Sequence, residues 1–395
     1  MATPYSPQSI FSPDPAGVVP RVFAAPPKYV QGPGVLKHVG RYLSLSGLRR
    51  VAVLASSRGH TADALQVAES LAGTGVTTVK AVFDGECSLP EITARVDQLS
   101  GESIDGIIAV GGGKCVDAGK CIAYRLGVGV VIVPTLASND APCSALSVLY
   151  APDGGMQGAE FFPQHPLMVV VDTQVVANAP ERYLVAGMGD AMATWYEAKV
   201  CIANPRGLNA LGGKPTLAAC AMGEICATTL YADAEASIAA VRVHAVDDSL
   251  ERVVEANTLL SGLGFESGGL AVAHGVAMGY TFLPEVEKNY LHGEMVAMGL
   301  VAQLMMEGDA SEAQRVAEFC ARVGLPIHLE QLSLTANDAR LEGVVEVTMG
   351  FQPLANLPFE PTHERVRDAI LGADTLGQAV ADAVGDTAYR RLQAA

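Results

Sequence analysis

Charged residues are scarce in this sequence, and basic residues are the scarcer kind. Only 17% of the 395 residues are charged, with 26 Lys and Arg against 42 Asp and Glu, which gives a net charge of −16. A nucleic-acid surface needs clustered Lys and Arg, so this balance argues against a nucleic-acid partner. No apolar run reaches the roughly 18–20 residues of a membrane span, so we expect no membrane partner either.

Cysteine is also sparse, and its spacing lacks any C-x-x-C pair. Several of the eight cysteines lie within apolar helical patterns, which is typical of small core residues in a reducing compartment. We therefore expect a cytoplasmic protein without disulfides or a thiolate zinc site. Residues 1–25 lack the charged start and long apolar stretch of a signal peptide and are rich in Pro, Ser and Ala, so a disordered extension is expected there.

Short apolar runs alternate with helical patterns up to about residue 180. The runs are rich in Val and Ile and nearly free of polar residues, as buried parallel strands are. Strands are predicted at 51–55, 78–83, 106–110, 130–133 and 167–171, and helices at 62–72, 90–99 and 115–126. This alternation predicts a doubly wound, Rossmann-like α/β domain over 26–181. Residues 147–162 break the pattern and are predicted to form a β-hairpin beside the sheet.

After residue 180 the strand signal disappears, and the rest is predicted to be all-helical. Helices are expected at 183–201, 216–231, 234–244, 250–263, 269–280, 292–306 and 310–323. We therefore expect a second domain, 182–395, that binds metal and substrate, with the site in the cleft between the two domains.

A Gly-Gly-Gly-Lys turn joins one predicted strand to the next helix. Gly112 and Gly113 let the backbone approach a ligand closely, and Lys114 adds a positive charge. Backbone N–H groups at such a strand-to-helix turn are suited to bind phosphate. The motif is neither G-x-G-x-x-G nor a Walker A loop, so an ordinary turn that binds nothing stays open.

One acid and two histidines lie in apolar helical patterns where charge is costly. They are Asp190, His274 and His292. One carboxylate and two imidazoles would leave an open position on a divalent metal, an arrangement that suits zinc or ferrous iron as a Lewis acid. Taken singly, each can equally be a satisfied core or surface group. The other six histidines lie in polar or turn-like surroundings, and no special role is assigned to them.

A polar loop, 133–147, follows the fourth predicted strand on the carboxyl side, where such sheets bind ligands. The hydroxyls of Thr135, Ser138 and Ser144 can donate to phosphate, ribose or carboxamide oxygens, and Asp140 can accept hydrogen bonds from a polyol. An ordinary loop of Asx and Ser/Thr turns is the alternative.

Four stretches together resemble a known family. Residues 111–120, 134–148, 185–191 and 255–271 are similar to the glycerol dehydrogenases, metal-dependent alcohol dehydrogenases of the iron-containing type that share their fold with dehydroquinate synthase. The resemblance runs from about Lys28 to beyond Met306. It implies NAD- or NADP-linked oxidation of glycerol to dihydroxyacetone and a homo-oligomer, an octamer.

The resemblance also implies roles for individual residues. Asp190, His274 and His292 stand where the family binds its catalytic zinc, and Asp140, with His274 and Phe265, would hold glycerol. The implied cofactor contacts are Ser56, Gly112, Gly113, Lys114, Asp117, Thr135, Ser138, Ser144, Leu146 and Tyr150.

Ser56 departs from the family pattern in a way that bears on the cofactor. Glycerol dehydrogenases usually have Asp here, at the end of the first predicted strand, where it would bind the adenosine ribose and repel a 2′-phosphate. Ser56, with Arg58 nearby, removes that repulsion, so we expect NADP(H) to be accepted. Two other departures, Cys115 and Asn139, are expected to be tolerated. The rival functions are a glycerol-1-phosphate dehydrogenase or another dehydroquinate-synthase-like enzyme, and a catalytically silent nucleotide-binding protein.

Overall fold

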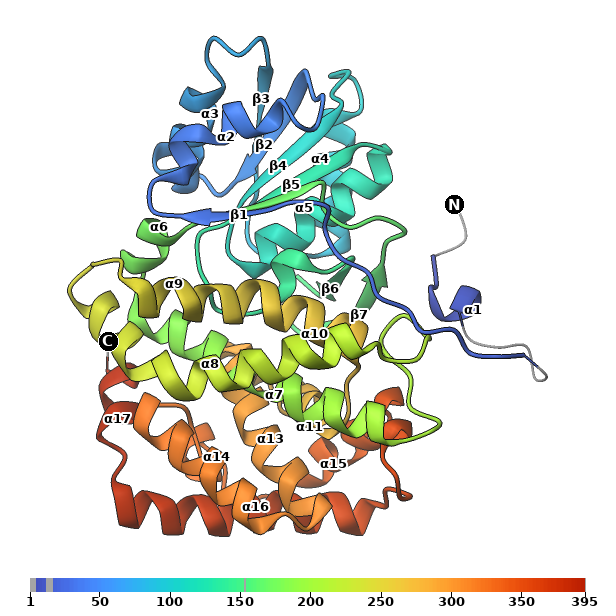
Figure 1. Cartoon of the computed structure of the whole chain (residues 1–395), viewed down its shortest axis with the longest axis vertical. Helices are drawn as coiled ribbons and strands as arrows, with labels where there is room; N and C mark the ends of the chain where they lie inside the picture. Colours follow the sequence, from blue (N-terminus) through green and yellow to red (C-terminus); the bar gives the residue numbers. More distant parts are fainter. Residues whose placement is uncertain (1–4, 12–16, 153, 395) are drawn as a thin grey trace.

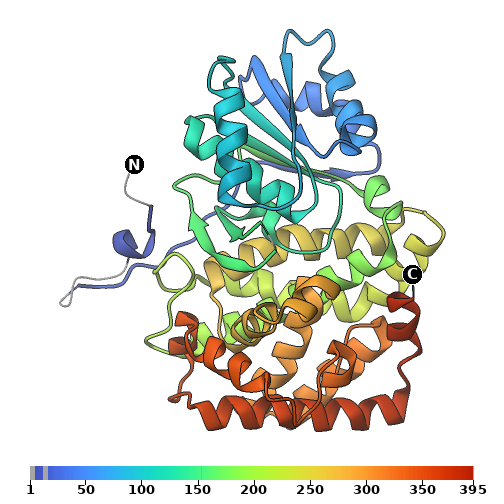
Figure 2. The same ribbon diagram turned by 180° about the vertical axis from the view of Figure 1, so that it is seen from behind.

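Two halves of different architecture lie one above the other along the longest axis of the molecule (Figures 1 and 2). The computed structural model describes residues 5–11, 17–152 and 154–394. An α/β half comes first in the chain and a helical half follows, so the predicted fold class is confirmed. The domain boundary at 181/182 remains a prediction.

A six-stranded parallel sheet forms the centre of the first half. Its order is β1 (Tyr29–Gly32), β8 (Met168–Asp172), β5 (Gly129–Pro134), β4 (Gly106–Gly111), β2 (Arg50–Ala55) and β3 (Thr77–Val82). Five of these strands match the predicted ones. β1 was not predicted, because it has only four residues, includes Gln31 and lies half-buried at the sheet edge.

Helices cover both faces of this sheet because alternate strand side chains point to opposite sides. Val51 and Val53 of β2 pack with α2 (Val39–Leu43) and α3 (Asp63–Leu71). Ala52 and Leu54 face the other side, toward α4 (Leu89–Leu99) and α5 (Gly113–Leu126). Short 3₁₀ segments at Val35–His38, Gly59–Thr61 and Ala141–Cys143 lie between these elements. The predicted hairpin is present as the antiparallel pair β6 (Leu146–Tyr150) and β7 (Met156–Phe161).

The second half is built from helices around two long buried ones, α7 and α13. Its α-helices are α6 (Thr173–Ala177), α7 (Glu181–Ala203), α8 (Leu217–Arg242), α9 (Asp248–Glu255), α10 (Ser261–Gly268), α11 (Val272–Thr281), α12 (Pro284–Asn289), α13 (His292–Glu307), α14 (Ala310–Val323), α15 (Leu341–Met349), α16 (His363–Val384) and α17 (Thr387–Gln393). A π-helical segment, Ala256–Leu260, joins α9 to α10, and 3₁₀ segments lie at Leu329–Leu332 and Gln352–Asn356.

Several predicted helix boundaries were wrong. The two helices expected at 216–231 and 234–244 are one helix, α8, and Asp233 lies within it, paired with Arg252 (Oδ1 to Nη2, 2.7 Å). α11 begins at Val272 rather than at Gly269, whose φ of +106° is not helical. Beyond residue 323 the chain was predicted to be helical without bounds for individual helices, and α15, α16 and α17 lie there.

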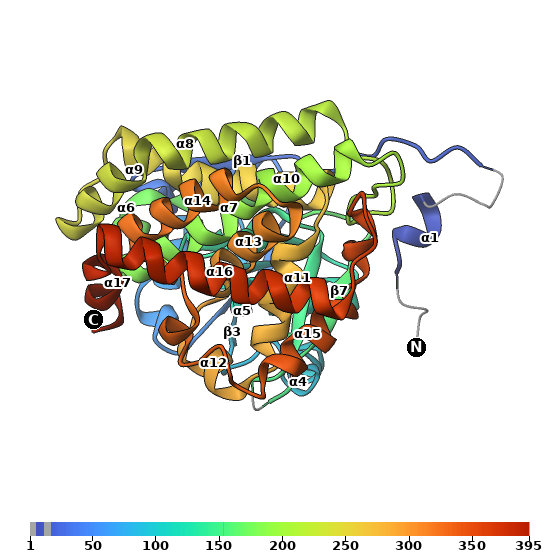
Figure 3. The same cartoon turned by 90° about the horizontal axis from the view of Figure 1, so that it is seen from below.

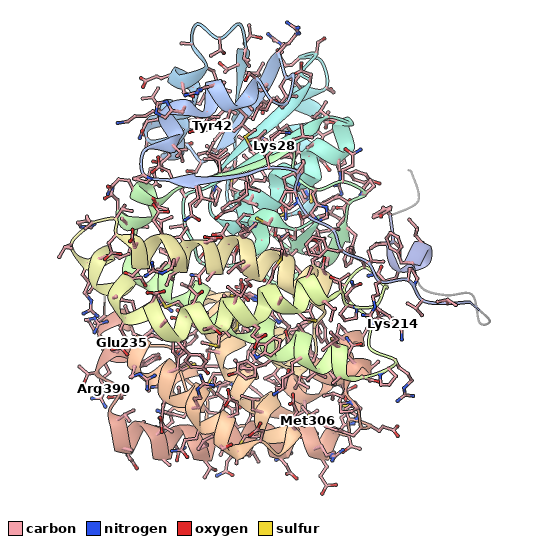
Figure 4. All side chains as sticks on the ribbon, viewed as in Figure 1. Lys28, Tyr42, Lys214, Glu235, Met306 and Arg390 are labelled. Carbon is pink, nitrogen blue, oxygen red and sulfur yellow. The ribbon has the colours of Figure 1, made fainter. Side chains whose placement is uncertain are left out.

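Part of the predicted N-terminal extension is ordered against the helical half, which differs from the expectation of disorder. The Val22 amide donates to the Lys214 carbonyl (3.1 Å), and the Lys214 amide donates to the Pro20 carbonyl (2.8 Å). The Ala24 amide donates to Ser267 Oγ (3.0 Å). Figure 4, in which Lys214 is labelled, shows this segment beside the loop that precedes α8. Residues 1–4 and 12–16 lie outside the described residues.

The remaining composition-based expectations concern membranes and thiols. Among the described helices, none combines the length and the apolar character needed to cross a bilayer. All eight cysteines are buried and unbridged, as expected of small core residues.

Candidate functional site

Asp190, His274 and His292 come together from three different helices. Asp190 Oδ1 lies 3.4 Å from His274 Nε2 and 3.5 Å from His292 Nε2. All three ligand atoms lie within 4.8 Å of one another. Asp190 is completely buried, whereas the His292 side chain is 44% exposed and lines the cleft. The three residues singled out as candidate ligands therefore form one cluster at the cleft.

Close approach of two helices places Asp190 beside His292. Gly293, which follows His292 at the start of α13, touches the backbone of α7: a Cβ here would lie 1.7 Å from the Ala186 carbonyl oxygen. Only glycine permits this distance. The contact brings the first turn of α13 next to the middle of α7, where Asp190 lies.

The site fits a divalent metal by its chemistry and its spacing. Asp190 Oδ1 is buried and has no hydrogen-bond partner among the described residues, which is costly for an ionised carboxylate. Ligand atoms around a tetrahedral zinc lie about 3.3 Å apart, since each bond is about 2.0–2.1 Å. The two carboxylate-to-imidazole distances are close to this value. Two imidazole nitrogens and one carboxylate oxygen form a donor set that suits zinc or ferrous iron.

A fully buried acid, Glu197, holds His274 from behind. His274 Nδ1 lies 2.6 Å from Glu197 Oε2, and Glu197 Oε1 accepts hydrogen bonds from the backbone amides of Ala271 (2.8 Å) and His274 (3.1 Å). A carboxylate bonded to Nδ1 fixes the ring so that Nε2 presents its lone pair to a metal. Glu197 was not predicted. It lies seven residues after Asp190, on the same face of α7, and this helical spacing is the signal that would have indicated it.

The charges around the three candidate ligands favour a cation at this point. Burial raises the pKa of Asp190, but His292 and His274 lower it below its usual value. Burial lowers the pKa of His274, but Glu197 and Asp190 raise it well above its usual value. The pKa of His292 falls, because the loss of water around its ring within the cleft and the charge of His274 outweigh the attraction of Asp190. A carboxylate-rich surrounding of this kind stabilises a positive charge, which a divalent metal would supply.

Asp140 adjoins the cluster through its backbone. Its amide donates to Asp190 Oδ2 (3.1 Å), and its own Oδ2 accepts a hydrogen bond from Ser261 Oγ (3.0 Å). Burial, and then the charge of Asp190, raises the pKa of Asp140 well above its usual value. Asp140, Phe265 and His274 all line the same cavity.

A buried lysine fixes the loop that carries Asp140. Lys120 Nζ donates to the carbonyls of Ala141 (3.0 Å) and Leu146, and it lies 2.9 Å from Asp117 Oδ1. Asp117 Oδ2 in turn accepts the Val148 amide (3.0 Å). Asp117, predicted to contact the cofactor, therefore ties α5 to the hairpin. Lys120, to which no role was assigned, anchors the loop.

The Gly-Gly-Gly-Lys turn lies at the carboxyl end of β4 and begins α5, as expected. Gly112 is the N-cap, and Gly113 is the first residue of the helix. A Cβ on Gly113 would be 2.5 Å from Asn139 Nδ2, so the Asn139 side chain of the polar loop packs directly against the turn. The first turn of this 14-residue helix lines the cavity, and the N–H groups at a helix N-terminus favour an anion.

One cavity of about 1780 Å³ connects the Gly-Gly-Gly-Lys turn with the candidate metal ligands His274 and His292. That volume is large enough for a dinucleotide and a small substrate together. The predicted contact residues that line it are Ser56, Gly112, Gly113, Lys114, Asp117, Thr135, Ser138, Asp140, Ser144, Leu146, Tyr150, Phe265, His274 and His292. Asp190 lies behind the wall, in contact with both histidines.

A π-helical turn beside the site is another feature that the sequence did not indicate. The segment Ala256–Leu260 carries buried Asn257, whose Nδ2 donates to the carbonyls of Ala137 (3.0 Å) and Leu184 (3.1 Å). Asn257 therefore joins the start of the polar loop to α7. Helical π-turns are frequent at functional sites, where they re-aim side chains.

Known proteins are similar to this chain in sequence and in fold. Residues 30–180 match the model of the iron-containing alcohol dehydrogenases. The chain is 40% identical to the glycerol dehydrogenase of Citrobacter freundii over 361 residues, which are 91% of this chain and 98% of that one. It is also 40% identical to the glycolaldehyde reductase of Halobacterium salinarum over 366 residues, or 91% and 99% of the two chains. The crystal structure of glycerol dehydrogenase from Schizosaccharomyces pombe superposes with a TM-score of 0.87 at 35% identity, covering 93% of each chain.

Proposed function

The chain belongs to the iron-containing alcohol dehydrogenase family, and on that premise we propose that it is a glycerol dehydrogenase. It oxidises glycerol, or another vicinal diol, reversibly to dihydroxyacetone or the matching hydroxyketone, with NAD or NADP as hydride acceptor. The observation that carries this proposal is that Asp190, His274 and His292 lie close together beside one cavity. The same cavity reaches the Gly-Gly-Gly-Lys turn, residues 111–114.

Asp190, His274 and His292 would hold zinc, with ferrous iron as the alternative. When bound, such a metal supplies Lewis acidity, which lowers the pKa of a substrate hydroxyl. Glu197 keeps Nε2 of His274 directed at that position through the 2.6 Å contact at Nδ1. Asp140 orients the neighbouring hydroxyl of a diol by accepting its hydrogen bond, and Phe265 packs against the carbon chain. The proton leaves through the substrate hydroxyl to water.

The dinucleotide would lie across the cleft, with its pyrophosphate at the N-terminus of α5. The amides of Gly113 and Lys114 would bind the phosphate oxygens. Thr135, Ser138 and Ser144 would hold the nicotinamide half, which brings the ring toward the substrate.

We propose that the enzyme accepts either NAD or NADP. Ser56, at the end of the cavity where the adenosine would lie, carries no charge that would repel the 2′-phosphate of NADP. Its Oγ accepts the Gly59 amide (3.0 Å), and Arg58 and Lys37, both exposed, lie in the same wall of the cavity. Asp63 also lines this wall and would oppose a 2′-phosphate. Comparing kcat/KM for the two cofactors tests this part. An NAD preference above about 100-fold, or about 2.7 kcal/mol, would overturn it.

A second candidate activity is the reduction of a small hydroxyaldehyde, which the similarity to the glycolaldehyde reductase favours. The same site would serve, since an aldehyde oxygen takes the place of the diol hydroxyl. A phosphorylated substrate is less favoured, because relatives that are about 40% identical over almost their whole length are glycerol dehydrogenases.

We also propose that the chain forms a homo-oligomer. The resemblance to the glycerol dehydrogenases implies an octamer. α8 lies along the outer edge of the helical half (Figure 3). Its apolar residues Leu217 and Ile225 are 77% and 56% exposed, and Val243, which directly follows the helix, is 71% exposed. Light scattering on the intact chain and on Ile225→Asp tests this: a monomer at micromolar concentration in both would contradict the proposal.

The decisive assay for the activity is cofactor reduction by the purified chain. Glycerol, propane-1,2-diol and glycerol 1-phosphate are compared as alcohols, and dihydroxyacetone, glycolaldehyde and dihydroxyacetone phosphate as carbonyl substrates, each with NAD(H) and NADP(H). The proposal predicts metal-dependent turnover of glycerol and dihydroxyacetone. Turnover of the phosphate esters alone, or of none of these compounds, would contradict it.

A further inference from the structure

Lys114 of the Gly-Gly-Gly-Lys turn forms ion pairs with two acids. Its Nζ lies 2.7 Å from Glu86 Oε2 and 3.7 Å from Glu287 Oε1. It also lies 4.8 Å from the centre of the Tyr150 ring, in cation–π geometry. The side chain is therefore held on several sides, and the group formed by one lysine and two glutamates has a net charge of −1.

The two acids reach Lys114 from different halves of the molecule and in different ways. Glu86 follows β3 in the α/β half and makes a short hydrogen-bonded ion pair. Glu287 belongs to α12 in the helical half and remains beyond hydrogen-bonding distance. Its side chain is only 17% exposed and faces the hairpin turn, where a Cβ on Gly154 would be 3.2 Å from Oε2. Glu287 therefore acts on Lys114 through its charge, and solvent screens that charge incompletely.

An acid in this place opposes the ligand that the turn is built to bind. A helix N-terminus and a lysine attract a pyrophosphate, whereas a carboxylate within about 4 Å of the same lysine repels it and competes for the ammonium group. Glu86 orients Lys114 by its short bond. Glu287 gives no such bond, so its effect on an anion in the cleft is mainly repulsive.

We propose that Glu287 sets the cofactor affinity: its carboxylate shares Lys114 with the dinucleotide pyrophosphate, weakens binding and speeds release of the reduced cofactor. This inference rests on the proposed function, in which the turn at Gly113 and Lys114 holds the pyrophosphate. Release of the reduced cofactor limits turnover in many dehydrogenase-type cycles where chemistry is fast. An affinity held low would then favour turnover over retention.

Glu287→Gln tests the proposal, because it removes the charge and keeps the shape. NADH and NADPH titrations, followed by nucleotide fluorescence, should give a Kd about five- to tenfold lower than that of the wild type at low ionic strength. Stopped-flow displacement should show slower release of the reduced cofactor. The difference should shrink in 0.5 M salt, since screening removes the repulsion.

Glu285→Gln is the matched control on the same helix. Glu285 is 76% exposed, pairs with Arg340 (3.1 Å) and does not contact Lys114. Its substitution should leave the Kd unchanged. A Kd for Glu287→Gln within twofold of the wild type or of this control, or a weaker one, would overturn the inference.

Lys114→Ala separates this inference from the proposed function. If the wild type binds NADH or NADPH, and Lys114→Ala weakens that binding while Glu287→Gln has no effect, the inference fails and the proposed function stands. If the wild type binds neither nucleotide, both fail.

Discussion

Substitution of Glu197 by Gln tests whether this residue positions His274 for metal binding. Glu197 is completely buried, and both of its oxygens are used, Oε2 by His274 Nδ1 at 2.6 Å and Oε1 by two backbone amides. Glutamine has the same shape but only one acceptor oxygen. If its NH₂ group faces Nδ1, it donates there and moves the ring proton to Nε2, which removes the lone pair needed by the metal. If it faces the amides of Ala271 and His274, donors oppose donors.

Either orientation weakens metal binding. Loss of such a supporting carboxylate typically lowers metal affinity about 10–100-fold, or about 1.4–2.7 kcal/mol. Competition with a chromophoric chelator measures the zinc affinity of the apo-protein directly, without any dependence on turnover. Glycerol oxidation should fall at limiting zinc and recover in excess zinc, because the three ligands themselves are unchanged.

Glu266→Gln is the matched control for this variant. Glu266 is also completely buried and pairs with His165 at the same distance, 2.6 Å, but neither residue belongs to the metal cluster. Its zinc affinity should match that of the wild type, whatever it loses in thermal stability. Equal zinc affinity in Glu197→Gln and the wild type would refute the positioning role of Glu197.

Three further substitutions have distinct expected outcomes. His274→Ala should abolish both metal retention, measured by elemental analysis, and turnover; a variant that keeps zinc and a normal rate would exclude His274 as a ligand. Asp140→Asn should lower kcat/KM at least tenfold more for glycerol than for a simple alcohol such as 2-propanol; an equal loss for both would exclude selective binding of the second hydroxyl. Burial raises the pKa of Glu181, but the opposite effect of Arg242 and Arg391 is larger, so the pKa lies below its usual value of 4.5. Its ionised form therefore stabilises the fold above pH 4.5, by about 1 kcal/mol. Thermal unfolding of Glu181→Gln should show a deficit at pH 7 that disappears as the pH falls below 4.5, and a deficit independent of pH would count against this assignment.

The strands of the α/β half were predictable because each central strand is a short run of Val, Ile and Ala that is buried on both faces. Their short length, their Val- and Ile-rich composition and the helical stretches between them identified these runs as strands. β1 escaped because an edge strand with Gln31 has no such pattern. The long helix α8 was divided in error between residues 231 and 234, where Asp233 continues the helix and pairs with Arg252.

The metal cluster was predictable for a different reason. Asp190 and His274 stand out because charge is costly in apolar helices. Glu197 is equally anomalous, but its role depends on the direction of the His274 ring, which only the packing of α7 against the start of α11 determines. The two acids on Lys114 come from positions 86 and 287, and no sequence spacing relates them.

The proposed activity requires one metal ion held by Asp190, His274 and His292. Anomalous diffraction at the zinc edge, from crystals of the intact chain grown with zinc, tests this site most directly. We predict a single strong peak per chain at about 2 Å from Asp190 Oδ1 and from Nε2 of both histidines. A peak elsewhere in the cleft, or none at these three atoms at saturating zinc, would contradict the proposed metal site.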